Sequence, residues 1–140
     1  MDIKEINICT ELGLDELKRL MEVLSPGKNI PVSNIREAIE SPSDHVYAVF
    51  DGAVIAGCAT LGVYHSPQGK KGAIEDVVVL PEYRGQGLGR LLLEHILEEA
   101  RNMAPIELHL TSRPSRVAAN ALYQSLGFTR KETNAYILHL

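Results

Sequence analysis

The chain has 140 residues, a formal net charge of −4, 45% hydrophobic residues and 23% charged residues. This length fits one domain over residues 1–140, and the apolar content excludes a disordered chain because it suffices to form a core. A mildly acidic protein has no overall positive field, so we expect no nucleic-acid partner.

No targeting or membrane-spanning segment is visible. The start, Met1 to Glu5, lacks the basic residues and apolar run of a secretory signal. No apolar stretch approaches the roughly 20 residues that span a bilayer, so no membrane partner is expected. The two cysteines, Cys9 and Cys58, form no close pair, and Cys58 is expected inside a strand as buried filler. A reducing cytoplasm is therefore the expected compartment.

The pattern of apolar residues and turn signals predicts alternating strands and helices. Strands are expected near residues 3–8, 46–50, 53–63, 73–80 and 106–111, with a final strand pair within 128–140. Helices are expected over residues 14–24, 33–40, 88–103 and 114–127. The order β-α-α-β-β-β-α-β-α-β-β predicts an α/β (α+β) fold, with a mixed, mostly antiparallel sheet and helices on its faces.

A glycine-rich turn between the fourth strand and the following helix has the features of an anion site. The strand ends at Pro81, and Gly85, Gly87 and Gly89 follow where the helix begins. Glycines allow left-handed backbone angles, and the first helical turn offers free N–H groups at the positive end of its dipole. Such a turn can hold a pyrophosphate. It lacks the Gly-Lys-Ser/Thr of a Walker loop and the G-x-G-x-x-G of a dinucleotide fingerprint.

The segment Arg84-x-x-Gly87-x-Gly89 resembles the R/Q-x-x-G-x-G/A pattern of the GNAT superfamily of acyl-coenzyme A-dependent N-acetyltransferases. The run from Asn120 through Tyr123 to Gly127-Phe128 is similar to a second region of that family. The resemblance covers roughly residues 74–128 and implies the GNAT fold, with about six or seven strands and about four helices.

The resemblance also implies that acetyl-coenzyme A (acetyl-CoA) is the cosubstrate and lies where two central strands diverge. Backbone groups of three strand residues would pair with its pantetheine arm, namely Val77, Val78 and Val79. Backbone N–H groups of the turn would bind its pyrophosphate, namely those of Arg84, Gly85, Gln86, Gly87, Leu88, Gly89 and Arg90. The spacing of Arg116, Asn120 and Tyr123 would place them on one cofactor-facing side of the later helix.

By the same resemblance the acetyl group moves directly to a primary amine in a ternary complex, with Tyr123 as general acid toward the coenzyme A thiolate. Glu75 is the expected base, directly or through a water, although an edge carboxylate that only attracts the cationic amine remains open. Successive strand residues point to opposite faces, so only one of Glu75 and Asp76 is expected to line the acceptor pocket. The five histidines are scattered without ligand spacing, so no metal is expected.

The sequence does not identify the molecule that accepts the acetyl group, and a small-molecule amine is the expected class. A protein N-terminus or lysine is an alternative acceptor, and a non-catalytic acyl-CoA-binding sensor is an alternative function. A homodimer through Ala135 to Leu140 is suggested by the family resemblance.

Overall fold

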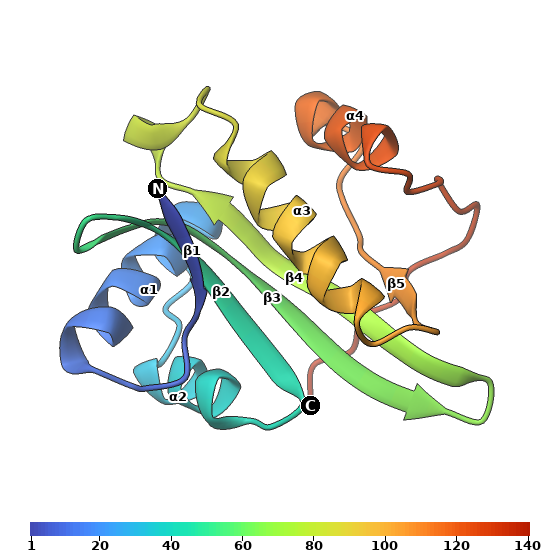
Figure 1. Cartoon of the computed structure of the whole chain (residues 1–140), viewed down its shortest axis with the longest axis horizontal. Helices are drawn as coiled ribbons and strands as arrows, with labels where there is room; N and C mark the ends of the chain where they lie inside the picture. Colours follow the sequence, from blue (N-terminus) through green and yellow to red (C-terminus); the bar gives the residue numbers. More distant parts are fainter. The chain divides into compact units, whose positions relative to one another are not determined.

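The structure is a computed structural model that describes all 140 residues, as two compact units of residues 1–110 and 111–140. The first unit holds a five-stranded sheet and three α-helices, and the second holds one α-helix and an extended C-terminal segment (Figure 1). None of the helices combines the length and apolar character needed to cross a membrane.

The sheet is mixed and mostly antiparallel, as predicted. Its strands lie in the order of the sequence, and only the pairing between the last two is parallel. The strands are β1 (Asp2–Glu5), β2 (Asp44–Asp51), β3 (Val54–Ser66), β4 (Gly69–Val79) and β5 (Glu107–His109). The helices are α1 (Glu11–Leu24), α2 (Val32–Glu40), the 3-10 helix η1 (Pro81–Tyr83), α3 (Leu88–Arg101) and α4 (Val117–Ser125).

Local signals in the sequence explain where the first elements begin and turn. The Thr10 hydroxyl accepts a hydrogen bond from the Gly13 N–H at 3.0 Å and so caps the start of α1. The predicted Asp51-Gly52 turn joins β2 to β3, with Gly52 at a φ of 60°. These short-range features fix the ends of the elements, whereas packing decides their arrangement.

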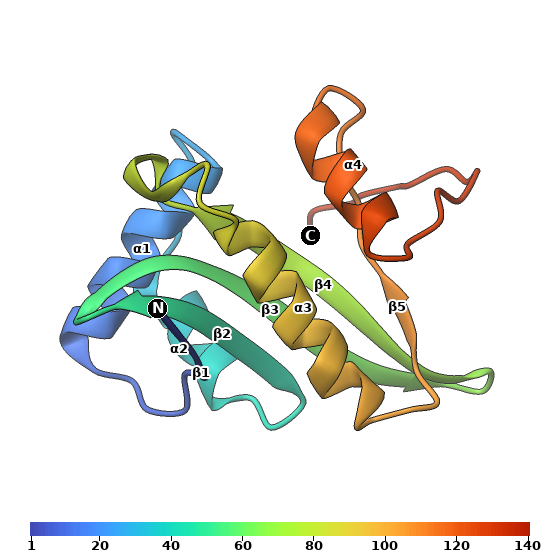
Figure 2. The same ribbon diagram turned by 45° about the horizontal axis from the view of Figure 1, so that its top comes forward.

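Helices cover both faces of the sheet in the first unit. Helices α1 and α2 lie on one face and α3 lies on the other (Figures 1 and 2). The α1/α2 face is filled by a cluster that includes Leu14, Leu17, Leu20, Ile35, Ile39, Val46, Ala48, Cys58 and Val78. On the other face α3 buries Leu88, Leu92, Leu93, Ile96 and Ala100. The sheet is therefore the shared wall of two apolar layers.

The final strand pair predicted within residues 128–140 is wrong, because these residues form no strand. Tyr136, Ile137, Leu138 and Leu140 are all largely exposed. Their pattern favours strand, but a strand also needs a hydrogen-bonded neighbour, and none pairs with this segment. The sheet consequently has five strands instead of six or seven. Association of two copies through residues 135–140 stays a prediction.

A β-bulge interrupts the pairing of β3 with β4. Thr60 lies opposite Glu75 and Cys58 lies opposite Val78, so two residues of β4 face one residue of β3. Asp76 is one of these two, and its φ of 54° places it in the left-handed region. The backbones approach closely beside the bulge, since a Cβ built on Gly57 would lie 2.8 Å from the Val78 carbonyl oxygen.

We predict that Gly57→Ala lowers the free energy of unfolding by about 1–3 kcal/mol, because the new methyl group meets backbone that cannot swing aside. Gly62→Ala on the same strand is the control, since its Cβ would lie 3.0 Å from a side-chain oxygen of Asp44 and no closer than 4.0 Å to the backbone oxygen of Ala73. Urea unfolding of both variants measures the difference. Equal stability of the two variants would contradict the close approach at the bulge.

Candidate functional site

The predicted anion-binding turn lies between η1 and α3 and has the backbone geometry that the glycines suggested. Gly85 and Gly87 both adopt a φ of 77°, and Gly87 is the N-cap of α3 without a side-chain cap. The Leu91 N–H donates the first intrahelical hydrogen bond, to Gly87 at 3.0 Å, so the N–H groups of Leu88 and Gly89 precede the helix ladder. Gly89 itself lies inside α3 without a left-handed angle, so only two of the three glycines need their conformational freedom.

Open space surrounds this turn. A Cβ built on Gly85 or Gly87 would meet nothing within 4 Å, and Arg84, Gly85, Gln86 and Gly87 are all exposed. The free N–H groups and the positive end of the α3 dipole therefore face a region that an anion can reach. The Arg84 side chain adds a positive charge, and its Nε donates to the Val79 carbonyl at 3.3 Å.

Two side-chain contacts attach the segment before the turn to the rest of the first unit. The Tyr83 hydroxyl donates to the Asp51 carboxylate at 2.8 Å, and Arg19 donates to Glu82 at 2.9 Å. These contacts link η1 to the β2–β3 hairpin and to α1. Sequence reasoning missed them, because the partners are 32 and 63 residues apart and no local pattern signals such a pair.

The second half of β4 has an open edge. β5 pairs with β4 only from Lys71 to Ala73, so residues 74–79 of β4 have β3 on one side and no strand on the other. Figure 2 shows β5 beside the first half of β4 and turning away from the second. An open strand edge presents unpaired N–H and C=O groups. Val77, Val78 and Val79 lie on this edge, which leads directly through η1 into the anion-binding turn.

Two carboxylates mark the bulge in the middle of β4. Burial raises the pKa of Glu75 above its ordinary value, and the nearby Asp76 charge raises it further. Burial also raises the pKa of Asp76, against the Lys28 ammonium, which lowers it. The expectation of opposite faces rested on regular alternation, which the bulge and the left-handed Asp76 interrupt at this point. The Asp76 charge therefore acts on Glu75 at this point of the strand.

The second unit holds the remaining predicted site residues. Arg116 lies at the N-cap of α4 and therefore precedes the helix, which differs from the predicted helical face. The Asn120 side-chain amide donates to the Arg113 carbonyl at 3.0 Å. Tyr123 is buried and its ring packs edge-on against Phe128, with centroids 6.3 Å apart. The cofactor-facing role of these three residues stays a prediction.

The chain offers neither a reactive cysteine at Cys58 nor a cluster of metal ligands. Cys58 is fully enclosed, as expected, and burial raises the pKa of its thiol to about 12, which makes it a poor nucleophile at neutral pH. No cluster of three or more His, Cys, Asp or Glu side chains is placed to hold a metal ion.

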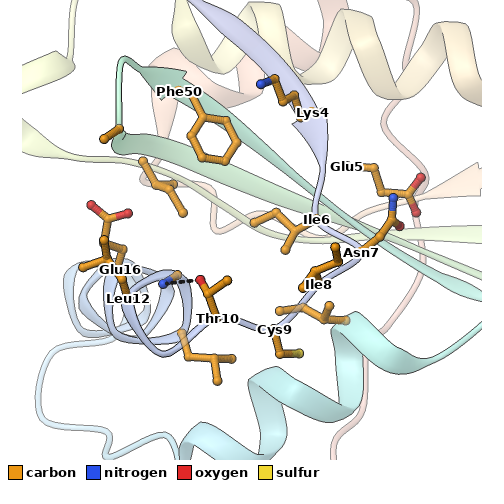
Figure 3. Close-up of a pocket in the computed structure, with 15 residues that line it drawn as sticks. Lys4, Glu5, Ile6, Asn7, Ile8, Cys9, Thr10, Leu12, Glu16 and Phe50 are labelled. Atoms are coloured by element: carbon orange, nitrogen blue, oxygen red, sulfur yellow. Dashed lines mark hydrogen bonds between the residues drawn. The ribbon is translucent and has the colours of Figure 1, made fainter.

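A pocket of about 380 Å³ opens beside the segment that joins β1 to α1 (Figure 3). Ile6, Ile8, Leu12 and Phe50 line it, and no residue of β4 or the anion-binding turn does. It is therefore not the candidate site.

We predict that Asp51→Asn lowers the pKa of the Tyr83 phenol toward its ordinary value. In the native chain the pKa of Tyr83 is raised because ionisation would break its hydrogen bond to Asp51 and place two negative charges together. A titration of the ring carbon resonances of Tyr83 by NMR measures the change, with the exposed Tyr136 as the internal control. An unchanged Tyr83 titration would contradict the contact that attaches η1 to the hairpin.

Comparison with known proteins shows which family the chain resembles. A family model described as "Acetyltransferase (GNAT) family" matches residues 14–128. A solved structure of an aminoglycoside N-acetyltransferase in complex with CoA has a TM-score of 0.81 at 20% identity, covering 99% of this chain and 93% of that one. At this identity the likeness shows the shared fold.

Two curated bacterial proteins are similar in sequence. The ribosomal protein bS18-alanine N-acetyltransferase of Escherichia coli K12 is 49% identical over 53 residues, 38% of this chain and 36% of that protein. The N-alpha-acetyltransferase RimI of Mycobacterium tuberculosis is 30% identical over 100 residues, 71% of this chain and 61% of that protein. The aligned segments thus span between about one third and three fifths of these relatives. With the family match extending over most of its length, the chain belongs to the GNAT acetyltransferase family.

Proposed function

We propose that the chain is an acetyl-CoA-dependent N-acetyltransferase that moves the acetyl group directly to a primary amine in a ternary complex. The observation that carries this proposal is the open edge of β4, which leads into the anion-binding turn at the start of α3. A long ligand with amide groups at one end and a pyrophosphate at the other matches this arrangement. Acetyl-CoA is such a molecule, and it supplies an acetyl thioester that amines can attack.

The backbone of the first unit offers the contacts that this ligand needs. The N–H and C=O groups that residues 77–79 present on the open edge can pair with the amides of the pantetheine arm, as an added strand would, and the Val79 carbonyl among them accepts from Arg84 Nε at 3.3 Å in this structure. The N–H groups from Gly85 to Arg90 surround the start of α3, where an anion is favoured by the helix dipole, whereas the Arg84 N–H donates to the Pro81 carbonyl at 3.2 Å in this structure. The CoA complex of the structurally similar aminoglycoside N-acetyltransferase supports this assignment.

Proton transfer is assigned to two side chains. A primary amine is mostly protonated at neutral pH, so the site must take a proton from it. Glu75 is the proposed base, directly or through a water, because its raised pKa makes its carboxylate a stronger proton acceptor than an ordinary one. Tyr123 is the proposed general acid, since a phenol keeps its proton at neutral pH and can give it to a departing sulfur.

We propose a small-molecule primary amine as the acceptor. The α-amino group of a protein is a second candidate, favoured by the relatives whose names specify an alanine of a ribosomal protein and an N-alpha position. Both share one chemistry, an unhindered amine that must lose a proton before attack. We also propose the cytoplasm as the compartment, on the two free cysteines.

The test is acetyl-CoA-dependent thiol release by the full chain across a panel of amines. The panel contains a polyamine, an amino sugar, an aminoglycoside, free amino acids and an alanyl peptide. We expect release that depends on one acceptor class. Coenzyme A binding without release would indicate the sensor alternative, and absence of binding would contradict the proposed function.

A matched pair of glycine variants links that activity to the turn. Gly87 and Gly27 have φ values of 77° and 81°, and a Cβ on either would meet nothing within 4 Å. Alanine at either position costs about 1–2 kcal/mol of backbone strain. We expect only Gly87→Ala to raise the KM for acetyl-CoA, by about tenfold or more, since the free N–H groups lie there. Equal KM values for both variants would contradict the site.

The roles of Glu75 and Tyr123 give a further prediction. We expect Glu75→Gln and Tyr123→Phe each to lower kcat by roughly 10²-fold at saturating substrates, the lower end of typical acid–base effects. Asp76→Asn should move the acidic limb of the kcat profile to lower pH, because removing the Asp76 charge removes one cause of the raised Glu75 pKa. Initial rates from pH 5 to 9 measure these changes. An acidic limb that vanishes in Asp76→Asn but persists in Glu75→Gln would assign the base to Asp76.

A further inference from the structure

A tight turn after α1 fixes the position of Lys28. The Lys28 N–H donates to the Ser25 carbonyl at 3.2 Å, and the φ of 81° at Gly27 suits the third residue of a type II turn. On either side of this turn, Leu24 and Ile30 pack against the apolar cluster of the α1/α2 face. The backbone of Lys28 therefore lies on the α1/α2 side of the sheet.

The Glu75 side chain points to the same side. Val46 lies opposite Thr60 and Thr60 lies opposite Glu75, so these residues form one row across β2, β3 and β4. Residues paired across neighbouring strands point to the same face of a sheet. Val46 belongs to the α1/α2 cluster, and the row therefore faces these helices. Asp76 follows at the bulge, and both carboxylates, although partly enclosed, are accessible to solvent.

Lys28 brings an unpaired positive charge to these carboxylates. Its ammonium lowers the pKa of Asp76, although burial has the larger and opposite effect, so the two groups lie near enough to interact. Lys28 is exposed, and its side chain makes no ion pair or hydrogen bond. By contrast, the Arg84 side chain already donates to the Val79 carbonyl at 3.3 Å. The Lys28 ammonium, on its flexible stem, can therefore turn toward a bound anion without losing a contact.

From this arrangement we infer that Lys28 selects acceptors in which the amine carries a nearby carboxylate, as a free amino acid does. The inference rests on the proposed function. Glu75 and Asp76 attract the ammonium of the acceptor, while Lys28 attracts its carboxylate. A zwitterion therefore complements the charges of the site with both of its groups.

Other amines match these charges less well. A polyamine or an aminoglycoside presents only cations, which Lys28 repels. A peptide offers an α-amine, but an uncharged amide takes the place of the carboxylate beside it. Lys28 thus favours one class of acceptor and disfavours another, and specificity depends on the difference between the two effects.

Lys28→Gln tests the inference, with Lys18→Gln as the matched control. Lys18 lies on the neighbouring α1, and of these two lysines only Lys28 acts on the Asp76 charge. The acceptors are the free amino acid that the native chain acetylates fastest and its amide, which keeps the amine and loses the carboxylate.

We expect Lys28→Gln to lower kcat/KM for the amino acid about fivefold, the effect of one unit charge about 4 Å away in water. The value for the amide and the KM for acetyl-CoA should stay unchanged, and Lys18→Gln should behave as the native chain. Because the Lys28 side chain makes no ion pair or hydrogen bond, urea unfolding of Lys28→Gln should give the native stability. Equal amino acid to amide ratios for the native and Lys28→Gln chains would overturn the inference.

A measurement without turnover separates the inference from the proposed function. Each amino acid of the panel is added to the native chain with coenzyme A present, and NMR spectra follow the side-chain resonances of Lys28. At least one amino acid should shift them, and its amide should not. Absence of such a shift, or a native chain that acetylates other amines but no amino acid, would also overturn the inference. A chain that acetylates no amine of the panel would overturn the proposed function, and the Lys28 resonances would then decide the inference by themselves.

Discussion

The arrangement of the site depends on where β5 stops pairing with β4. A strand in the middle of a sheet normally satisfies its backbone on both sides, yet β4 does so only as far as Ala73. From Ile74 onward its outer N–H and C=O groups need another partner. The anion-binding turn follows directly, because the chain leaves this same strand through η1 and enters α3 at Gly87. One interruption of the sheet thus produces an open strand edge that leads into the glycine-rich turn, and these are the two features on which the proposed acetyl-CoA site rests.

Beside that open edge, the bulge carries two carboxylates with raised pKa values. A regular strand would send Glu75 and Asp76 to opposite faces, but the extra residue and the left-handed Asp76 interrupt that alternation here. Their raised pKa values follow from burial and, for Glu75, also from the nearby Asp76 charge. Gly57 permits the close approach of β3 that the bulge requires. The close backbone approach and the raised carboxyl pKa values therefore occur at the same part of β4.

Local features of the sequence predicted most of this architecture. The turn between Pro81 and Arg90 was predictable, because glycine freedom and a helix start are short-range properties. The antiparallel hairpins and four α-helices were predictable from periodicity and turn residues. Three features were not predictable: the bulge, the end of the β4–β5 pairing at Ala73 and the absence of strands in residues 128–140. Each depends on pairing between strands distant in the sequence, and side-chain alternation alone does not determine the partner.

Amide hydrogen exchange with and without coenzyme A tests the central claim most directly. If the ligand pairs with the open edge, the backbone amides of residues 74–79 and 85–90 should exchange more slowly when it is bound. The outer edge strand β1 provides the comparison, since Asp2–Glu5 is also unpaired on one side but leads to no anion-binding turn. We predict protection at β4 and the turn with no change at β1. Binding of coenzyme A without protection of residues 74–79, or equal protection of both edges, would contradict the account.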